Sequence, residues 1–185
     1  AFWWDRFEGM MSAYYDGSAW YRSRPSAIAI TEMTEEGPEK IPLPSVPDIV
    51  GDRQGHAHAW WLPGDDGPSA RAGDEDVGDL EPLMHSSMTI GEREGSDPDV
   101  VADSALVWRA EAGPDGTMHL LYVRLLDTET APAGVYYRNL ASDGGAWSTP
   151  YLLYPSIYLR LLSRDRAHLE LAAEGERVYA GWDDP

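Results

Sequence analysis

The sequence predicts an all-β fold, and three observations lead to this prediction. Aromatic residues are numerous and are mostly of the types that favour strands, with 8 Trp and 10 Tyr against 2 Phe in 185 residues. Short apolar runs recur between turn residues, whereas helical periodicity is almost absent. Asp-Gly turns lie within residues 14–20 and 134–150, each after a Tyr-Tyr pair and before a Trp, which is typical of β-hairpins.

The expected strands follow one another at short intervals and are bounded by Gly, Pro, Asp or Ser. They cover residues 2–6, 10–15, 19–22, 27–30, 48–50, 55–61, 83–90, 104–109, 117–125 and 135–137, a strand opened by Trp147, then 151–154, 168–172 and 176–182.

Two long segments between these strands have a different composition. Residues 31–48 hold four prolines and are expected to run extended over the surface. Residues 63–82 carry seven acidic side chains against the single Arg71, which predicts an acidic inserted loop.

A repeat of about 60 residues runs through the chain. The glycines Gly55, Gly116 and Gly175 are 61 and 59 residues apart, and each precedes an apolar strand that ends in an aromatic residue. A fixed period with about four strands per unit predicts a β-propeller with four-stranded blades. A β-sandwich or another all-β fold is the alternative. The prediction is one partial propeller domain over residues 1–185, with units at about 5–61, 62–122 and 123–182.

Three blade equivalents cannot close a ring, because propellers usually have about 4–8 blades. The chain also ends at Trp182-Asp183-Asp184-Pro185, in a pattern that should continue into a hairpin. We therefore expect a partner that completes the ring: a missing or cleaved remainder of the same propeller, or another subunit.

Charge and composition restrict the classes of partner and the compartment. The net charge of −18 argues against nucleic acid and anionic membrane surfaces as partners. No apolar run approaches the roughly 20 residues that a membrane span needs. Cysteine is absent, which excludes disulfides and thiolate chemistry. Ala1 is a residue that could follow the cleavage site of a signal peptide. We therefore expect an exported bacterial protein that is extracellular or bound to the cell surface.

Residues 110–150 carry a family likeness. A Gly turn, an apolar strand with an aromatic end, a Tyr-Tyr-Arg strand and Asp-Gly-Gly-Ala-Trp-Ser together resemble the Asp-box (BNR) repeats of sialidase-like β-propellers. The family box reads Ser/Thr-x-Asp-x-Gly-x-x-Trp. Here the Asp-to-Trp spacing is one residue short, Ala141 stands where the Ser or Thr would be, and the middle unit has no box. The resemblance implies that the box residues hold a hairpin at the blade periphery. These residues are Asp16, Trp20, Asp143, Gly145 and Trp147.

The catalytic residues of that family are not matched here. Its first arginine lies in a Tyr/Phe-Arg-Ile-Pro motif, and the closest stretch, residues 21–25, has one residue too many and directly follows a box. No catalytic residue is therefore predicted, and no cofactor is required.

Two patterns are compatible with metal binding. Asp74, Asp76 and Asp79 offer clustered oxygen ligands for Ca²⁺, and a solvated acidic loop is the alternative. His56 and His58 have a spacing that zinc sites can use. Because His119 falls at the position equivalent to His58, a repeated strand position is the alternative for these histidines.

The sequence thus favours a non-catalytic, exported or cell-surface propeller module that binds a glycan or protein partner or serves in assembly. The alternative is a sialidase-like glycoside hydrolase whose catalytic residues lie largely outside this segment.

Overall fold

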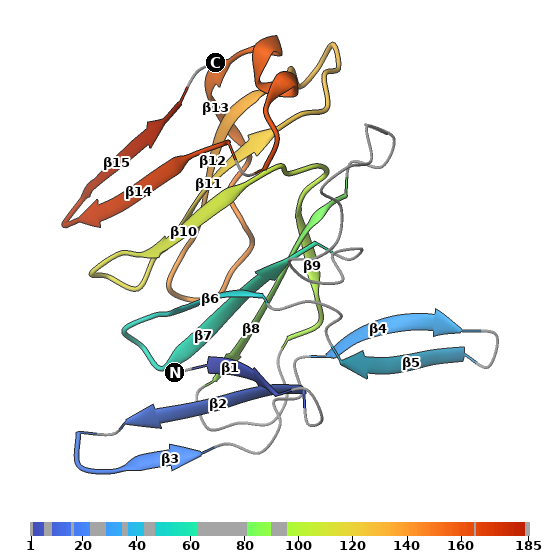
Figure 1. The fold of residues 1–185 in the computed structure, drawn as a ribbon. Coiled ribbons are helices and arrows are strands. Elements are labelled where there is room, and N and C mark those ends of the chain that lie inside the picture. Colours follow the sequence, from blue (N-terminus) through green and yellow to red (C-terminus); the bar gives the residue numbers. More distant parts are fainter. Residues whose placement is uncertain are drawn as a thin grey trace. The chain divides into compact units, whose positions relative to one another are not determined.

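The described residues of the chain form β-sheets, which confirms the all-β prediction. The computed structural model describes residues 2–5, 9–15, 17–22, 29–34, 37–42, 47–62, 81–89, 96–164 and 166–183 (Figure 1). Within these ranges there is no α-helix, and the only helix is the short 3₁₀-helix η1 (Ile157–Leu161). No helix in this part of the chain is long and apolar enough to cross a membrane.

The described residues form two four-stranded sheets and three smaller ones. Each four-stranded sheet is a meander whose strands lie in chain order. The first contains β6 (Asp48–Gly51), β7 (His56–Trp61), β8 (Leu83–Thr89) and β9 (Asp99–Ala102). The second contains β10 (Trp108–Ala112), β11 (Met118–Arg124), β12 (Gly134–Leu140) and β13 (Tyr151–Pro155).

The smaller sheets have two or three antiparallel strands. They are β1 (Phe2–Asp5), β2 (Gly9–Tyr15) and β3 (Trp20–Arg22); β4 (Ala29–Thr34) and β5 (Gly37–Pro42); and β14 (Leu169–Glu174) and β15 (Arg177–Trp182).

The residues group into two compact units. One comprises Ala1–Gly51, Gly55–Asp74 and Met84–Val100, and the other comprises Asp52–Gln54, Glu75–Leu83 and Val101–Pro185. The sheet β10–β13, helix η1 and the β14–β15 hairpin all belong to the second unit. No sheet closes on itself in the described part of the chain, so the propeller and its three units stay predictions.

The core of the second unit forms around β11, which is buried at all seven positions. Its sequence, Met-His-Leu-Leu-Tyr-Val-Arg, shows no polar alternation, as expected of a strand that is covered on both faces. Leu121 and Val123 on one face belong to an apolar cluster that joins β11 to β12, η1 and β14. The other fully buried members of this cluster are Val135, Leu159 and Leu169, with Val107 beside them.

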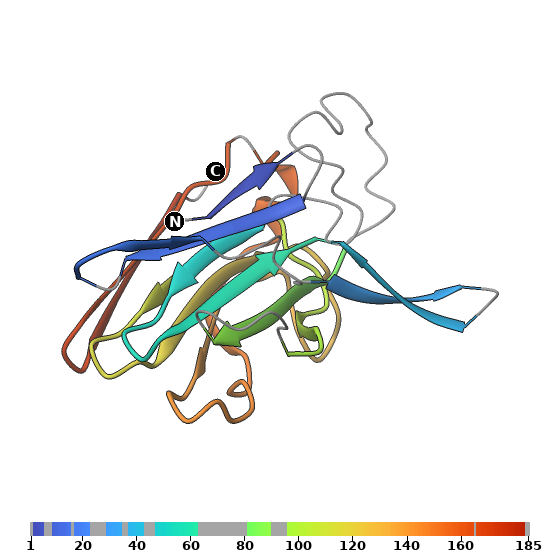
Figure 2. The same ribbon diagram turned by 90° about the horizontal axis from the view of Figure 1, so that it is seen from below.

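Residues 31–48 were predicted to run extended, and their first part does so, but as a paired hairpin of β4 and β5 that was not predicted (Figure 2). Gly37, at φ 118°, opens β5 with a conformation that other residues rarely adopt. Pro38 and Pro42 lie four residues apart in β5, so both occupy the same kind of ladder position. In a two-stranded ribbon, positions that face away from the partner need no N–H donor, and proline is tolerated there.

Three further elements differ from the prediction. Strand β9 was not predicted, and its four residues carry little pattern. Strand β10 begins at Trp108 instead of Ser104. The two residues before it bond to Val123 outside the regular ladder: Leu106 N–H donates to the Val123 carbonyl, and Val123 N–H donates to the Val107 carbonyl. Helix η1 was also not predicted, since five residues are too few for a periodic signal.

Leu121→Ala should lower the free energy of unfolding by about 2–5 kcal/mol, because it opens a cavity in the core around β11. Urea denaturation measures this change. The matched control is Leu153→Ala, at a partly exposed position of β13, which should cost less than about 1 kcal/mol. Equal losses for the two variants would contradict the assignment of the core.

Candidate binding surface

The β12–β13 hairpin brings two chain segments unusually close at its base. Gly134 lies opposite Pro155 in the register, and a Cβ atom at residue 134 would collide with the carbonyl oxygen of Tyr154. Glycine therefore permits this close approach of two backbones. The register shifts between Val135 and Tyr136, which is the signature of a β-bulge.

The turn of this hairpin contains the second Asp-Gly box. Gly144 has φ 73° and donates its N–H to the Ala141 carbonyl at 3.1 Å. The carboxylate of Asp143 accepts the N–H of Gly145 at 3.2 Å, as in an Asx turn. Asp143 is exposed and Trp147 is half-buried. That these residues serve as a blade fastener stays a prediction.

Sequence reasoning placed the start of the second strand at Trp147, but β13 begins at Tyr151. Before Tyr151 the regular ladder of backbone hydrogen bonds between the two strands is interrupted, and side chains contribute hydrogen bonds there. Arg138 donates to the carbonyls of Ser148 at 2.6 Å and Trp147 at 3.2 Å, and also to the Val101 carbonyl. Burial lowers the pKa of Arg138, and these carbonyls are what its desolvated guanidinium contacts. The Arg that follows the Tyr-Tyr pair is the sequence signal for this arrangement.

The first box is described only in part. Asp16 lies outside the described residues, whereas Gly17 has φ 101° and accepts a hydrogen bond from the Tyr15 hydroxyl at 2.8 Å. Trp20 is 63% exposed, and its ring lies 5.5 Å from that of Tyr15.

The predicted calcium ligands Asp74, Asp76 and Asp79 also lie outside the described residues. Within the ranges that are described, no group of three or more His, Cys, Asp and Glu side chains is arranged to hold a metal ion. The calcium site stays a prediction.

His58 of β7 and His119 of β11 occupy corresponding positions in their strands, and both are buried. His58 Nδ1 lies 3.0 Å from Nε2 of His85 on β8, and His119 Nδ1 lies 2.7 Å from the hydroxyl of Tyr137 on β12. Each histidine thus contacts a side chain of the next strand in its sheet, which favours the repeated strand position over a zinc site. Burial first, and the charge of His58 second, lower the pKa of His85 to about 3.

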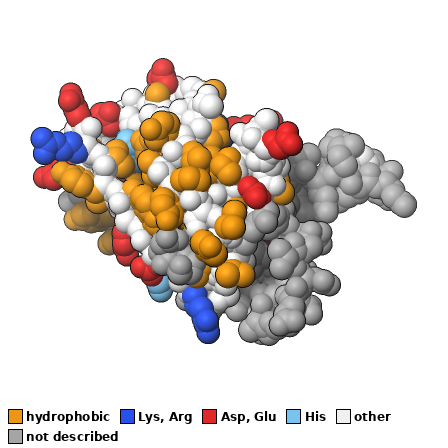
Figure 3. Space-filling model, turned by 90° about the horizontal axis from the view of Figure 1, so that it is seen from above, with side chains coloured by type: hydrophobic (Ala, Val, Ile, Leu, Met, Phe, Trp, Pro, Cys, Tyr) orange, Lys and Arg blue, Asp and Glu red, His pale blue; other side chains and the backbone are white. Residues whose placement is uncertain are grey.

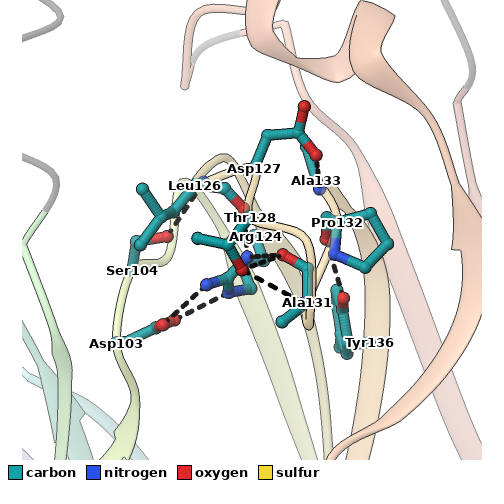
Figure 4. Close-up of polar contacts among 10 residues, drawn as sticks. All are labelled: Asp103, Ser104, Arg124, Leu126, Asp127, Thr128, Ala131, Pro132, Ala133 and Tyr136. Atoms are coloured by element: carbon teal, nitrogen blue, oxygen red, sulfur yellow. Dashed lines mark hydrogen bonds and ion pairs between the residues drawn. The ribbon is translucent and has the colours of Figure 1, made fainter.

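A buried arginine holds the loop between β11 and β12 (Figure 4). Arg124, with a side chain 5% exposed, donates from Nε and Nη2 to the two carboxylate oxygens of Asp103 at 2.8 and 2.7 Å. Its Nη1 donates to the carbonyls of Leu126 and Ala131. The Asp103 hydrogen bond raises the pKa of Arg124, and the same bond lowers the pKa of Asp103. Arg124 thereby joins three chain segments at one point.

Further bonds fix the end of the same loop. The Tyr136 hydroxyl donates to the Pro132 carbonyl at 2.7 Å, and Ala133 N–H donates to the Asp127 carboxylate at 3.2 Å. Ser156 N–H donates to the Ala133 carbonyl at 3.0 Å, which joins the loop to the residue that precedes η1. Sequence reasoning did not find this network, because its members are far apart in the chain.

An open hollow of about 290 Å³ lies between this loop and the junction of β13 with η1. Its lining is mostly apolar and comprises Pro132, Ala133, Tyr154, Pro155, Ser156, Ile157 and Tyr158.

Large apolar side chains are exposed beside the hollow. Seen from the side on which η1 lies in Figure 1, apolar side chains gather over the described surface (Figure 3). We call the following five the β13–η1 patch: Tyr151 (66% exposed), Leu153 (37%), Ile157 (59%), Tyr158 (59%) and Leu161 (79%). Leu159 of η1 points the other way and is fully buried, so the helix is anchored while its outer side stays exposed. Such a surface can bind an apolar partner.

Arg124→Met should lower the free energy of unfolding by about 2–4 kcal/mol, because it leaves buried loop carbonyls without a donor. Asp103→Asn should cost less than about 1 kcal/mol, since Asp103 is 56% exposed and its charge is screened by solvent. Urea denaturation of both variants checks this order. Equal effects would show that the ion pair, and not the anchoring of the loop, provides the stability.

Acid should weaken the protein partly through His85. In the unfolded chain this histidine takes up a proton near pH 6.5, whereas in the folded chain it does so only near pH 3. Its contribution to stability is therefore complete above about pH 6.5 and is lost as the pH falls toward 3. Between pH 7 and 5 the wild type should lose about 1–2 kcal/mol more than His85→Gln in urea denaturation. Parallel pH dependences would refute this role.

No protein-family model matches this chain, and a search of curated proteins also finds no match. The likeness to Asp-box propellers therefore rests on the pattern of the residues themselves.

Proposed function

We propose that this chain is a non-catalytic module of an exported or cell-surface β-propeller, and that it binds a protein partner through the β13–η1 patch. The observation that carries the proposal is that five large apolar side chains are exposed on two elements that follow one another in the chain, β13 and η1. Contiguous apolar surface of this kind commonly marks an interaction site in soluble proteins.

The hydrogen-bonded loop beside the hollow favours a role in recognition. The hollow beside it is bounded by a loop that Arg124 and Tyr136 hold through several hydrogen bonds. A surface that is already rigid loses little conformational entropy when it binds. Exposed side chains that project from a fixed backbone can therefore act as anchor residues.

The composition of the patch favours a protein over a glycan. Leu153, Ile157 and Leu161 are aliphatic and offer dispersion contacts but no hydrogen bonds. Sugar hydroxyls would lose their bonds to water there without replacement. Apolar protein side chains match such a surface, as in the centre of protein–protein interfaces.

A hydrolase would need a pair of carboxyl groups beside the bound sugar. The β13–η1 patch contains no carboxylate, so the sialidase-like alternative has no support at this surface.

The propeller assignment is supported by the two consecutive meanders. Each has four antiparallel strands, and each has a glycine with positive φ before its second strand, at Gly55 and Gly116. The two glycines lie 61 residues apart, in keeping with the 60-residue period, although the sheets span Asp48–Ala102 and Trp108–Pro155 instead of the predicted units.

The double variant Ile157→Asp/Leu161→Asp should abolish binding at the patch, because two charges would be buried in the interface. Peptides selected from a displayed random library against the wild-type chain serve as the probe. They should be rich in apolar residues and bind the double variant at least about tenfold more weakly. Val100→Asp, at an apolar position 58% exposed in β9, is the matched control and should leave affinity unchanged.

Three results would overturn this function. Peptides that bind both variants equally would place the interaction elsewhere on the chain. Patch-dependent binding on a glycan array would identify a glycan as the partner. Turnover of a fluorogenic sialoside by the purified chain would contradict the non-catalytic assignment.

A further inference from the structure

Strand β15 corresponds to β7 and β11 in every local feature except burial. Each is the second strand of a hairpin, follows a glycine with positive φ and carries an aromatic residue at or near its end; the glycines are Gly55 (φ 93°), Gly116 (φ 84°) and Gly175 (φ 58°). Strand β7 is buried at five of six positions and β11 at all seven. In β15, five of six residues are exposed.

The difference in burial comes from a third strand, which pairs with the outer edge of β7 and of β11 but is not seen beside β15 in the described part of the chain. Strand β8 pairs with β7 over six residues, and β12 pairs with β11 over seven. Strand β15 pairs with β14 alone among the described elements. In both corresponding positions of this chain, the cover is therefore a third antiparallel strand.

The ladder of the β14–β15 hairpin shows which backbone groups face the open edge. Glu174 and Arg177 close a two-residue turn, and Asp183 N–H donates to the His168 carbonyl at 3.3 Å at the other end. Bonded and non-bonded pairs alternate between these two points. The N–H and C=O groups of Val178, Ala180 and Trp182 consequently point away from β14.

The side chains at these positions are also suited to a further strand. Val178, Ala180 and Trp182 lie opposite Ala173, Leu171 and Leu169, so one face of the hairpin is an unbroken apolar row. The row continues from the core, because Leu169 is fully buried and Leu171 and Trp182 pack against the same cluster. An added strand with apolar alternate residues would extend this row by cross-strand contacts.

We propose that β15 accepts an antiparallel β-strand from another polypeptide, one that resembles β12 in having apolar and aromatic residues at consecutive ladder positions. Strand β12 supplies Val135, Tyr136 and Tyr137 to the corresponding edge of β11. A second copy of this chain is disfavoured as the donor, because two molecules that each carry −18 repel one another. The edge shares no residue with the β13–η1 patch, although the Trp182 ring lies 5.9 Å from that of Tyr154, which lines the hollow beside the patch. This proposal goes beyond the function assigned to that patch.

The probe is a synthetic peptide with the sequence of residues 133–142, added to the 185-residue chain. Amide hydrogen exchange, followed residue by residue by NMR, is the readout. The amides of Val178, Ala180 and Trp182 should exchange at least about tenfold more slowly, whereas those of Tyr179 and Gly181, already bonded to β14, should change little. Absence of this alternation with peptide at about 1 mM would overturn the proposal.

Ala180→Pro tests the edge itself. It removes an outward N–H while it leaves the bonds to β14 in place, and proline is tolerated at such positions. It should weaken peptide binding at least about tenfold, whereas Ala180→Val, which keeps the donor, should change it less than about threefold. If Ala180→Pro does not fold, the peptide with proline in place of Tyr136, whose N–H faces the β11 edge in the native pairing, tests the same ladder from the other side, and undiminished binding would refute strand addition.

Two controls separate this proposal from its alternatives. Ile157→Asp/Leu161→Asp should bind the peptide normally, so a failure of one proposal leaves the other intact. Protection of the three amides without peptide, lost on dilution, would identify a second copy as the donor and overturn the choice of another polypeptide.

Discussion

The second unit depends on one constraint, which is the burial of β11 on both faces. A strand in this position needs apolar residues without alternation, and it must find partners for any polar side chain that it carries. Its two polar residues do so within the sheet and its loops. His119 bonds to Tyr137 on the neighbouring strand, and Arg124, at the end of β11, bonds to Asp103 and to loop carbonyls.

The position of the proposed binding surface follows from the hydrogen-bond acceptors that surround the buried guanidinium of Arg124. A guanidinium presents five donors in a fixed plane, and burial requires acceptors around it. Asp103 supplies two oxygens, and the carbonyls of Leu126 and Ala131 supply the others. The loop that carries these carbonyls continues into Pro132 and Ala133, which line the hollow. The geometry of the surface is therefore set by a core residue that does not itself line the hollow.

Features with a local cause could be predicted from the sequence, and features with a distant cause could not. Strands β7, β11 and β15 were expected within two residues of their ends, because a glycine turn and an apolar run lie side by side in the chain. The late start of β13 depends on Arg138, and the prolines of β5 depend on which way their ladder positions face. The contact of Arg124 with Asp103 spans 21 residues and follows no spacing rule.

The β13–η1 patch and the edge of β15 would recognise a partner through different kinds of contact. The β13–η1 patch is made of exposed side chains from a strand and a short helix, so the proposed partner would be selected there by the shape and polarity of side chains. At β15 the backbone itself offers donors and acceptors, and a partner is selected by its ability to be extended and antiparallel. Strand β11 shows what the second mode produces, since the same kind of strand becomes fully buried once β12 is added. An edge of this kind favours completion of a sheet, whereas the patch favours recognition of a separate, folded protein surface.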